Sequence, residues 1–280
     1  MSGQNNEVEF RRILVALDAS HPSLAALEAA VELAASMKAK LEGLYVEDIH
    51  LLQAAGSPVA REVRFPFVSS TQLDSNRMTR QLRAQAKQAE RALAAACQRR
   101  EIEWSFRVVR GEVSHEVMAA AQEVDMLILG RASRPLVRKT RLGSTALTAA
   151  VQSPCCVLLL QRGERIAPPV IAVYDGSPVA RRALRVATRL AKRNGGYLAV
   201  LLVAETPSEE YRLQAETADW LRRQGVLVRY RRIPERSVLA VKQVLEAERN
   251  GLVVFSSTVL HLAELQRLLD EIHSPVLLVH

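Results

Sequence analysis

The stretch ILVALDASHPSLAALEAAVELAASMKAKLEGLYV, residues 13–46, decides the fold of this chain. It begins with a short unbroken apolar run at 13–17, which is typical of a strand buried on both faces of a parallel sheet. Ser20 or Ser23 can then cap a helix whose apolar residues recur at helical spacing. A second apolar run follows at 41–46. The stretch therefore predicts a β-α-β unit, whose crossover should be right-handed.

The chain repeats this unit without a gap at an offset of 157 residues, so that Asp18 aligns with Asp175 (175 − 18 = 157). The two repeats also end alike, because Ser-Pro precedes an apolar run at 153–160 and again at 274–279. An internal repeat of this length indicates a duplicated domain. We expect two α/β domains, at 9–162 and 168–280, with a short polar linker between them.

Residues 49–77 interrupt the pattern of the first repeat and have no counterpart in the second. We expect a long excursion from the sheet, with a helical turn or two. It serves either as a lid or partner contact or as a simple insertion, since loops of this length are usually functional or disordered. Beyond it the patterns predict a long helix, a strand, a short helix and a strand, at 78–100, 104–109, 115–122 and 126–129.

A basic segment with glycine at both ends lies between the strand that ends at Gly130 and the last strand of the first repeat. Gly143, Ser144 and Thr145 open an Ala-rich helix there. The first turn of a helix has N–H groups without internal partners and a partial positive charge. Glycine permits close approach of the backbone, and the hydroxyls can donate. Positive charge around this predicted anion site would come from Arg131, Arg134, Arg138, Lys139 and Arg141.

The corresponding segment of the second repeat, from Ser256 to Glu264, has no glycine and no basic loop, and it gains an acidic residue. Serine and threonine can still cap a helix there. However, close approach of an anion to the backbone is hard without glycine. We therefore expect the second half to keep the fold and to lack the site.

The opening V-x-x-D-x-S at 15–20, the β-α-β unit and the glycines of the basic segment together resemble the universal stress protein family. The resemblance covers nearly the whole chain, as two fused copies. It implies two five-stranded parallel sheets of a Rossmann-like fold, of the adenine-nucleotide alpha hydrolase type. It also implies that the two copies pair through their last strands as a pseudo-dimer within one chain.

The family motif G-x2-G-x9-G-[ST] implies an adenine nucleotide (ATP, ADP or AMP) in the first domain, with a Mg²⁺ ion able to bind through the phosphates. Ser133 stands where the family has its second glycine, and the nine-residue spacer at 134–142 is intact. Serine can still donate its N–H if its backbone dihedrals suit an L-residue. The nucleotide-binding residues that we expect are Ala16, Leu17, Asp18, Val46, Gly111, Gly130, Arg131, Ser133, Gly143, Ser144 and Thr145.

Two of these residues have a second interpretation from the sequence alone. Asp18 could accept hydrogen bonds from the ribose or the adenine amino group, or it could bond its own backbone in a turn. Asp175, whose half lacks the loop, is interpreted as such a turn residue. Gly111 could face the ligand or only permit a turn.

Composition restricts the partners. The net charge is +8 and aromatic residues make up 4%, and no basic cluster is interleaved with aromatics, so no nucleic-acid platform is expected. No apolar run approaches the length of a membrane span. Three cysteines do not form a disulfide framework, which favours the cytoplasm. The six histidines show no metal-ligand spacing.

The expected function is regulation in a stress response. Nucleotide occupancy would alter the basic loop and the excursion, and an unidentified protein partner would respond to the change; further pairing into a homodimer stays open. One alternative is an interaction or scaffold protein without a ligand, in which Ser133 marks a decayed site. Another is a slow ATPase, although no catalytic residue is expected because no carboxylate or glutamine is clearly placed to orient water.

Overall fold

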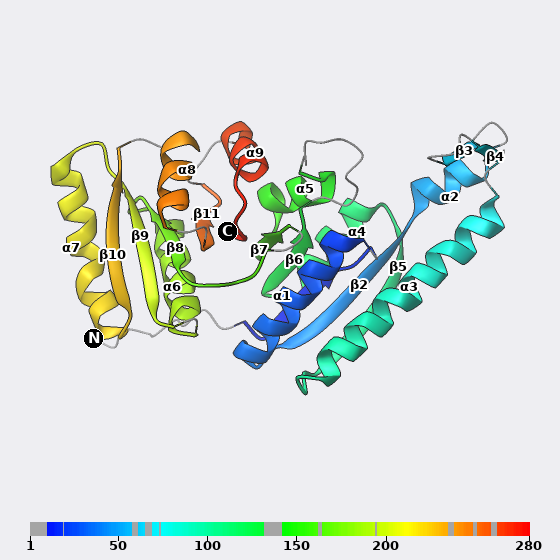
Figure 1. Cartoon of the computed structure of the whole chain (residues 1–280), viewed down its shortest axis with the longest axis horizontal. Coiled ribbons are helices and arrows are strands. Elements are labelled where there is room, and N and C mark those ends of the chain that lie inside the picture. Colours follow the sequence, from blue (N-terminus) through cyan, green and yellow to red (C-terminus); the bar gives the residue numbers. More distant parts are fainter. Residues whose placement is uncertain are drawn as a thin grey trace.

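The computed structural model describes the chain from Phe10 to His280, with gaps at 19, 58–60, 65–68, 73, 132–141, 162–163, 194, 235–237, 249–250 and 259–261. Two α/β halves lie side by side in an elongated molecule (Figure 1). Within the described residues no helix has the length and hydropathy that crossing a bilayer requires.

The first half contains a parallel five-stranded sheet in the order β7-β6-β1-β2-β5. Its strands are β1 (Arg12–Ala16), β2 (Lys40–Asp48), β5 (Trp104–Gly111), β6 (Met126–Gly130) and β7 (Cys156–Leu160). Its helices are α1 (His21–Met37), α2 (Ile49–Ala55), α3 (Ser75–Gln98), α4 (Val113–Ala121) and α5 (Ser144–Gln152). The apolar runs of the sequence thus form the strands that were expected, and Ser20 caps α1 by accepting a hydrogen bond from Ser23 N.

The second half repeats this arrangement in the order β10-β9-β8-β11-β12, again with parallel neighbours. Its strands are β8 (Val170–Tyr174), β9 (Tyr197–Val203), β10 (Leu227–Ile233), β11 (Leu252–Ser256) and β12 (Val276–Val279). Its helices are α6 (Pro178–Arg193), α7 (Pro207–Arg223), α8 (Val238–Ala247) and α9 (Leu262–Glu271).

The two sheets join through their last strands. β12 pairs with β7 in the antiparallel direction, with Leu277 opposite Leu158, so the chain forms one ten-stranded sheet. The side chains at this seam are buried, and no strand edge is left open where the halves meet. The expected pseudo-dimer of five-stranded parallel sheets within one chain is therefore confirmed.

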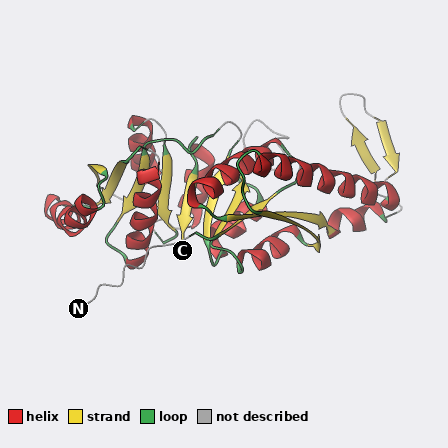
Figure 2. Cartoon of the chain, turned by 90° about the horizontal axis from the view of Figure 1, so that it is seen from below, coloured by secondary structure: helices red, strands yellow, loops and turns green. Residues whose placement is uncertain are grey.

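Helices cover both faces of the sheet (Figures 1 and 2). The buried residues of α1, α3, α6 and α7 form a core on one face, and those of α4, α5, α8 and α9 form a core on the other. Alanine, valine, leucine and isoleucine make up most of both cores. The inner strands are buried on both faces, so their sequences are apolar runs, whereas the edge strands β5 and β10 mix polar and apolar residues.

The excursion has more regular structure than the sequence predicted. Asp48 caps α2, and the chain then forms an antiparallel hairpin of β3 (Arg61–Arg64) and β4 (Ser69–Gln72) before Asp74 caps α3. The expected helical turn or two corresponds to α2, whereas the hairpin was not predicted. Its polar strands lack the apolar alternation that marks a half-buried strand. Figure 1 places the hairpin at the end of the molecule away from the second half.

Candidate functional site

Most of the expected site residues lie at one edge of the first sheet. β1 ends at Ala16 and is followed by Leu17 and Asp18, β6 ends at Gly130 and β5 ends at Gly111. Parallel neighbours end at the same edge, so these strand ends lie together, with Val46 of β2 among them. After β1 the chain crosses to β2 on one side, and after β6 it crosses to β7 on the other. The space between β1 and β6 is thus a topological switch point, where open α/β sheets bind ligands.

The N-terminus of α5 follows β6 at this edge. Gly143 is the N-cap residue, and as a glycine it has no side chain that could cap the helix. The first hydrogen bond of the helix runs from Leu147 N to Gly143 O at 2.9 Å. The N–H groups of Ser144 and Thr145 precede that bond and have no hydrogen-bond acceptor among the described residues. Gly143 has an ordinary φ of −64°, so its value as glycine is the lack of a side chain in front of these donors.

The two hydroxyls at this helix start differ in their surroundings. Ser144 is exposed, and its hydroxyl has no hydrogen-bond partner among the described residues. Thr145 is half-buried, and its Oγ1 lies 3.2 Å from the hydroxyl of Ser114 in α4. Ser144 is therefore the hydroxyl that is free to donate to an anion, whereas Thr145 joins the starts of α4 and α5.

Backbone hydrogen bonds join the two ends of the basic loop, residues 131–142, which we call the loop root. Arg131 N donates to Leu160 O of β7 at 2.7 Å, and Gly143 N donates to Arg131 O at 2.8 Å. The residues on either side of the loop are thus fixed to the sheet and to each other. Ser133, together with Arg134, Arg138, Lys139 and Arg141, lies outside the described residues.

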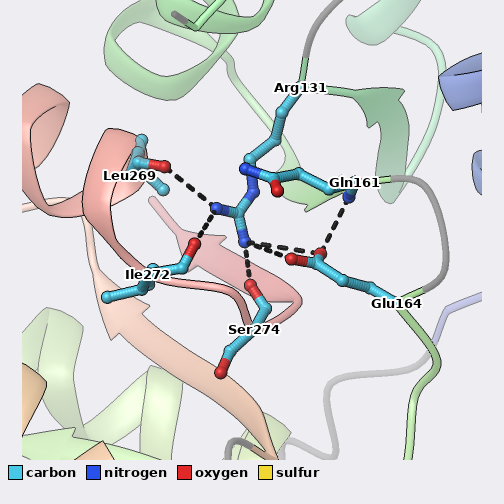
Figure 3. Close-up of polar contacts among 6 residues, drawn as sticks. All are labelled: Arg131, Gln161, Glu164, Leu269, Ile272 and Ser274. Carbon is cyan, nitrogen blue, oxygen red and sulfur yellow. Dashed lines mark hydrogen bonds and ion pairs between the residues drawn. The ribbon is translucent and has the colours of Figure 1, made fainter. Parts of the chain in front are cut away.

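The side chain of Arg131 is directed into the second half of the chain (Figure 3). Its Nη1 donates to Leu269 O at 2.9 Å and to Ile272 O at 2.8 Å, and its Nη2 donates to Ser274 O. Both carboxylate oxygens of Glu164 lie 3.4 Å from Nη2. The residue is 1% exposed. This conformation differs from the expected one. The guanidinium pairs with the Glu164 carboxylate and donates to backbone carbonyls of the second half, and it does not face the anion site.

Burial of the guanidinium lowers the pKa of Arg131 from its ordinary value, and the nearby carboxylates of Glu164 and Asp270 raise it. Arginine normally stays protonated in proteins, so the group is a buried cation held by one carboxylate and three carbonyls. Glu164 is itself positioned by Gln161 N, which donates to its Oε2 at 2.8 Å. No local sequence signal could have predicted this arrangement, because its partners lie 33 to 143 residues further along the chain.

Asp18 forms the turn that the sequence left as one of two interpretations. Its Oδ1 accepts from Ser20 N at 3.0 Å, and its own N–H donates to Ser23 Oγ at 3.1 Å. In the second half, Oδ1 of Asp175 accepts from Ser177 N at 3.0 Å in the same way. Asp18 is exposed, and its other carboxylate oxygen accepts no hydrogen bond from a described residue. The turn therefore leaves part of this carboxylate open to a ligand.

Two carboxylates that the sequence did not single out also lie at this edge. Glu47 of β2 is buried and accepts from Arg110 Nη2 at 2.7 Å. The side chain of Glu116 lies against Gly111, where a Cβ would collide with its carboxylate. Glycine at position 111 thus gives room to the Glu116 side chain, which is flexible enough to shift. Burial raises the pKa of Tyr45 to about 12, and the charges of Asp18 and Glu47 add to the shift.

The same edge of the second half is occupied by side chains. Tyr174, the position aligned with Leu17, is 1% exposed. Its pKa is raised by burial, and its hydroxyl is hydrogen-bonded to the ion pair that Arg181 of α6 and Glu216 of α7 form at 2.5 Å. Gly176 has a φ of +81°, and a Cβ there would lie 2.9 Å from Leu213 of α7. This turn is thus packed closely against α7.

Metal ligands do not cluster in the described part of the chain. No group of three or more His, Cys, Asp or Glu side chains is placed there to hold a metal ion. The three cysteines are free thiols, and Cys97 and Cys155 are buried.

Comparisons with known proteins agree with the fold. A model of the universal stress protein family matches residues 9–161 and 168–262. A universal stress protein from Archaeoglobus fulgidus DSM 4304 is 15% identical over 98% of each chain, with a TM-score of 0.72. A functionally unknown protein from Pseudomonas aeruginosa PAO1 is 15% identical over 98% of this chain and 94% of its own, with a TM-score of 0.66. No curated protein matches the chain in sequence.

One further solved structure is a universal stress protein in complex with cAMP. It is 21% identical and covers 55% of this chain and 99% of its own, with a TM-score of 0.38. That similarity is too low to extend its ligand to this chain.

Proposed function

The chain belongs to the universal stress protein family as a tandem member, and on that premise we propose that its first half binds one adenine nucleotide for regulation. The observation that carries the proposal is the difference between two equivalent edges. In the first half, the start of α5 has unbonded N–H groups behind a glycine, whereas Tyr174 and its ion pair occupy the edge of the second half. A ligand would therefore bind in one half only.

The residues at the first edge fit the parts of ATP, ADP or AMP. The N–H groups of Ser144 and Thr145 and the hydroxyl of Ser144 would hold phosphate oxygens. The exposed carboxylate of Asp18 would accept from the ribose, and the strand ends at Ala16, Leu17 and Val46 would contact the adenine. A Mg²⁺ ion would bind through the phosphates of a triphosphate. The side chain of Arg131 has no part in this assignment.

A regulatory role is favoured over catalysis because the open oxygen of Asp18 is assigned to the ribose and the neighbouring Glu47 is paired with Arg110. A carboxylate so engaged is poorly suited to orient an attacking water. We propose that a protein partner recognises the loop and the hairpin of the first half, in the cytoplasm, where free thiols such as the three cysteines persist.

One observation favours a second candidate, a scaffold without a ligand. The N–H of Gly143 is already bonded to Arg131 O, so the root of the loop is closed in the absence of an anion. Nucleotide binding would have to use the donors beyond it, at Ser144 and Thr145.

Thermal unfolding of the full chain with and without ATP·Mg separates the two candidates. A ligand that binds the native state raises stability by RT ln(1 + [L]/Kd), about 2.7 kcal/mol at 100 times Kd, which corresponds to several degrees in Tm. Mg²⁺ with inorganic triphosphate at the same concentration is the control for nonspecific anion binding. An unchanged Tm at millimolar ATP would contradict nucleotide binding and leave the scaffold.

A further inference from the structure

The last turn of α9, in the second half, contacts both ends of the basic loop of the first half. At the start of the loop, the guanidinium of Arg131 donates to Leu269 O and Ile272 O (Figure 3). At its end, Leu142 N donates to Oδ1 of Asp270 at 2.9 Å. Residues 131 and 142 are thus both fixed to one helix end that lies more than 120 residues further along the chain.

The contact at Arg131 is well matched in charge. The last carbonyls of a helix lack internal donors and carry a partial negative charge, so a cation there is favourable. The guanidinium is almost fully excluded from water, and Glu164 balances its charge. A buried cation is stable only while these partners stay in place. The start of the loop is therefore held rigidly against α9.

The second half has a different residue at the position of Arg131. Ser257 occupies it, because its N–H donates to Val279 O of β12 just as Arg131 N donates to Leu160 O of β7. A serine side chain is too short to reach across the seam as the arginine does. Within the described residues, the side-chain contact across the seam at this position is therefore made from the first half only.

We propose that the end of α9 positions the loop of the first half. The positioning residues are Asp270 on α9 and Arg131 at the start of the loop. They fix the loop root so that the start of α5 presents its N–H groups at the site. The consequence for ligand affinity rests on the proposed nucleotide binding. By thermodynamic reciprocity, a nucleotide that prefers the fixed loop also strengthens the contact between the loop and α9.

Hydrogen exchange at the amide of Leu142, in the full chain without nucleotide, tests the positioning directly. Asp270→Ala removes the acceptor and should speed exchange by about tenfold. Asp270→Asn keeps a side-chain oxygen and should stay within about twofold of the wild type. Glu271→Ala is the matched control on the same helix, because it breaks the pairs with Arg267 of α9 and Lys242 of α8 and leaves Asp270 in place. If Asp270→Ala proves unfolded, Asp270→Glu replaces it and should show an intermediate increase.

The affinity for ATP·Mg, measured by calorimetry on the same variants, completes the test. We expect Asp270→Ala to weaken binding by about fivefold to tenfold, and Asp270→Asn and Glu271→Ala to change it by less than about twofold. Unchanged exchange at Leu142 in Asp270→Ala would overturn the proposal, as would faster exchange with unchanged affinity. If the wild type binds no ATP, the proposed function fails, and the exchange data alone then decide the positioning role.

Discussion

The two halves of the ten-stranded sheet share the same β-α-β pattern. They differ in the residues that lie at the carboxyl ends of their strands. In the first half, a glycine precedes the open start of α5, and Asp18 is exposed. In the second half, Tyr174 is buried beneath the ion pair of Arg181 and Glu216. The backbone turn made by the aspartate is the same in both halves. The turn was therefore kept in both halves, whereas among the described residues the glycine with unbonded N–H groups behind it lies in the first half.

The second half nevertheless contributes to the first. Its strand β12 completes the sheet, and the end of α9 holds Arg131 and Leu142. In a symmetric pair of identical domains each partner would support the other equally. Here the last strands support each other, whereas among the described residues the side-chain contact of Arg131 anchors the loop of the first half.

The largest expected effect comes from removing the contact that ties the halves together. Arg131→Met leaves Glu164 and three carbonyls at and just beyond the end of α9 buried without their cation, and it should lower the free energy of unfolding by about 3–5 kcal/mol. Urea unfolding measures this change. Arg267→Met is the control, because its exposed pair with Glu271 should contribute less than about 1 kcal/mol.

Pairing Arg131→Met with Glu164→Gln should recover part of that loss, since the uncompensated carboxylate is then neutral. A loss below about 1 kcal/mol in the single variant would show that the buried contact does not hold the halves together.

A side chain at position 143, before the start of α5, should block the N–H donors that distinguish the first half from the second. The φ of Gly143 suits any residue, so we expect Gly143→Val to fold and to abolish the ATP-induced rise in Tm by blocking the donors of Ser144 and Thr145. Gly56→Ala, at another glycine with an ordinary φ of −81°, is the control and should keep the rise. A wild-type response in Gly143→Val would place the ligand elsewhere.

A smaller effect should separate the two aligned aspartates. Asp18→Ala and Asp175→Ala each lose the same hydrogen bond to a serine N–H two residues on, so each serves as the stability control for the other. Asp18→Ala should weaken ATP binding by about tenfold, the value of a hydrogen bond to a charged group, and Asp175→Ala should leave it unchanged. Calorimetric titration measures both, and equal losses would contradict a single site.

Much of the architecture could be predicted from the sequence, because buried parallel strands are unbroken apolar runs and the repeat aligns without a gap. The edge that gathers Asp18, Gly130 and Gly143 follows from the same topology. The hairpin at 61–72 could not be predicted, since its polar strands carry no alternation. The direction of Arg131 was also hidden, because a loop arginine looks the same whether it faces an anion or a helix end far along the chain. The ion pair of Arg181 and Glu216 could not be predicted either, because its two residues lie on different helices.

The number of nucleotides bound per chain tests the central claim most directly. Equilibrium dialysis of the purified full chain against labelled ATP with Mg²⁺ should give one ATP per chain at saturation. Gly143→Val should give none, and Asp175→Ala should still give one. A value of two in the wild type would contradict the asymmetry of the halves, and a value of zero would contradict nucleotide binding altogether.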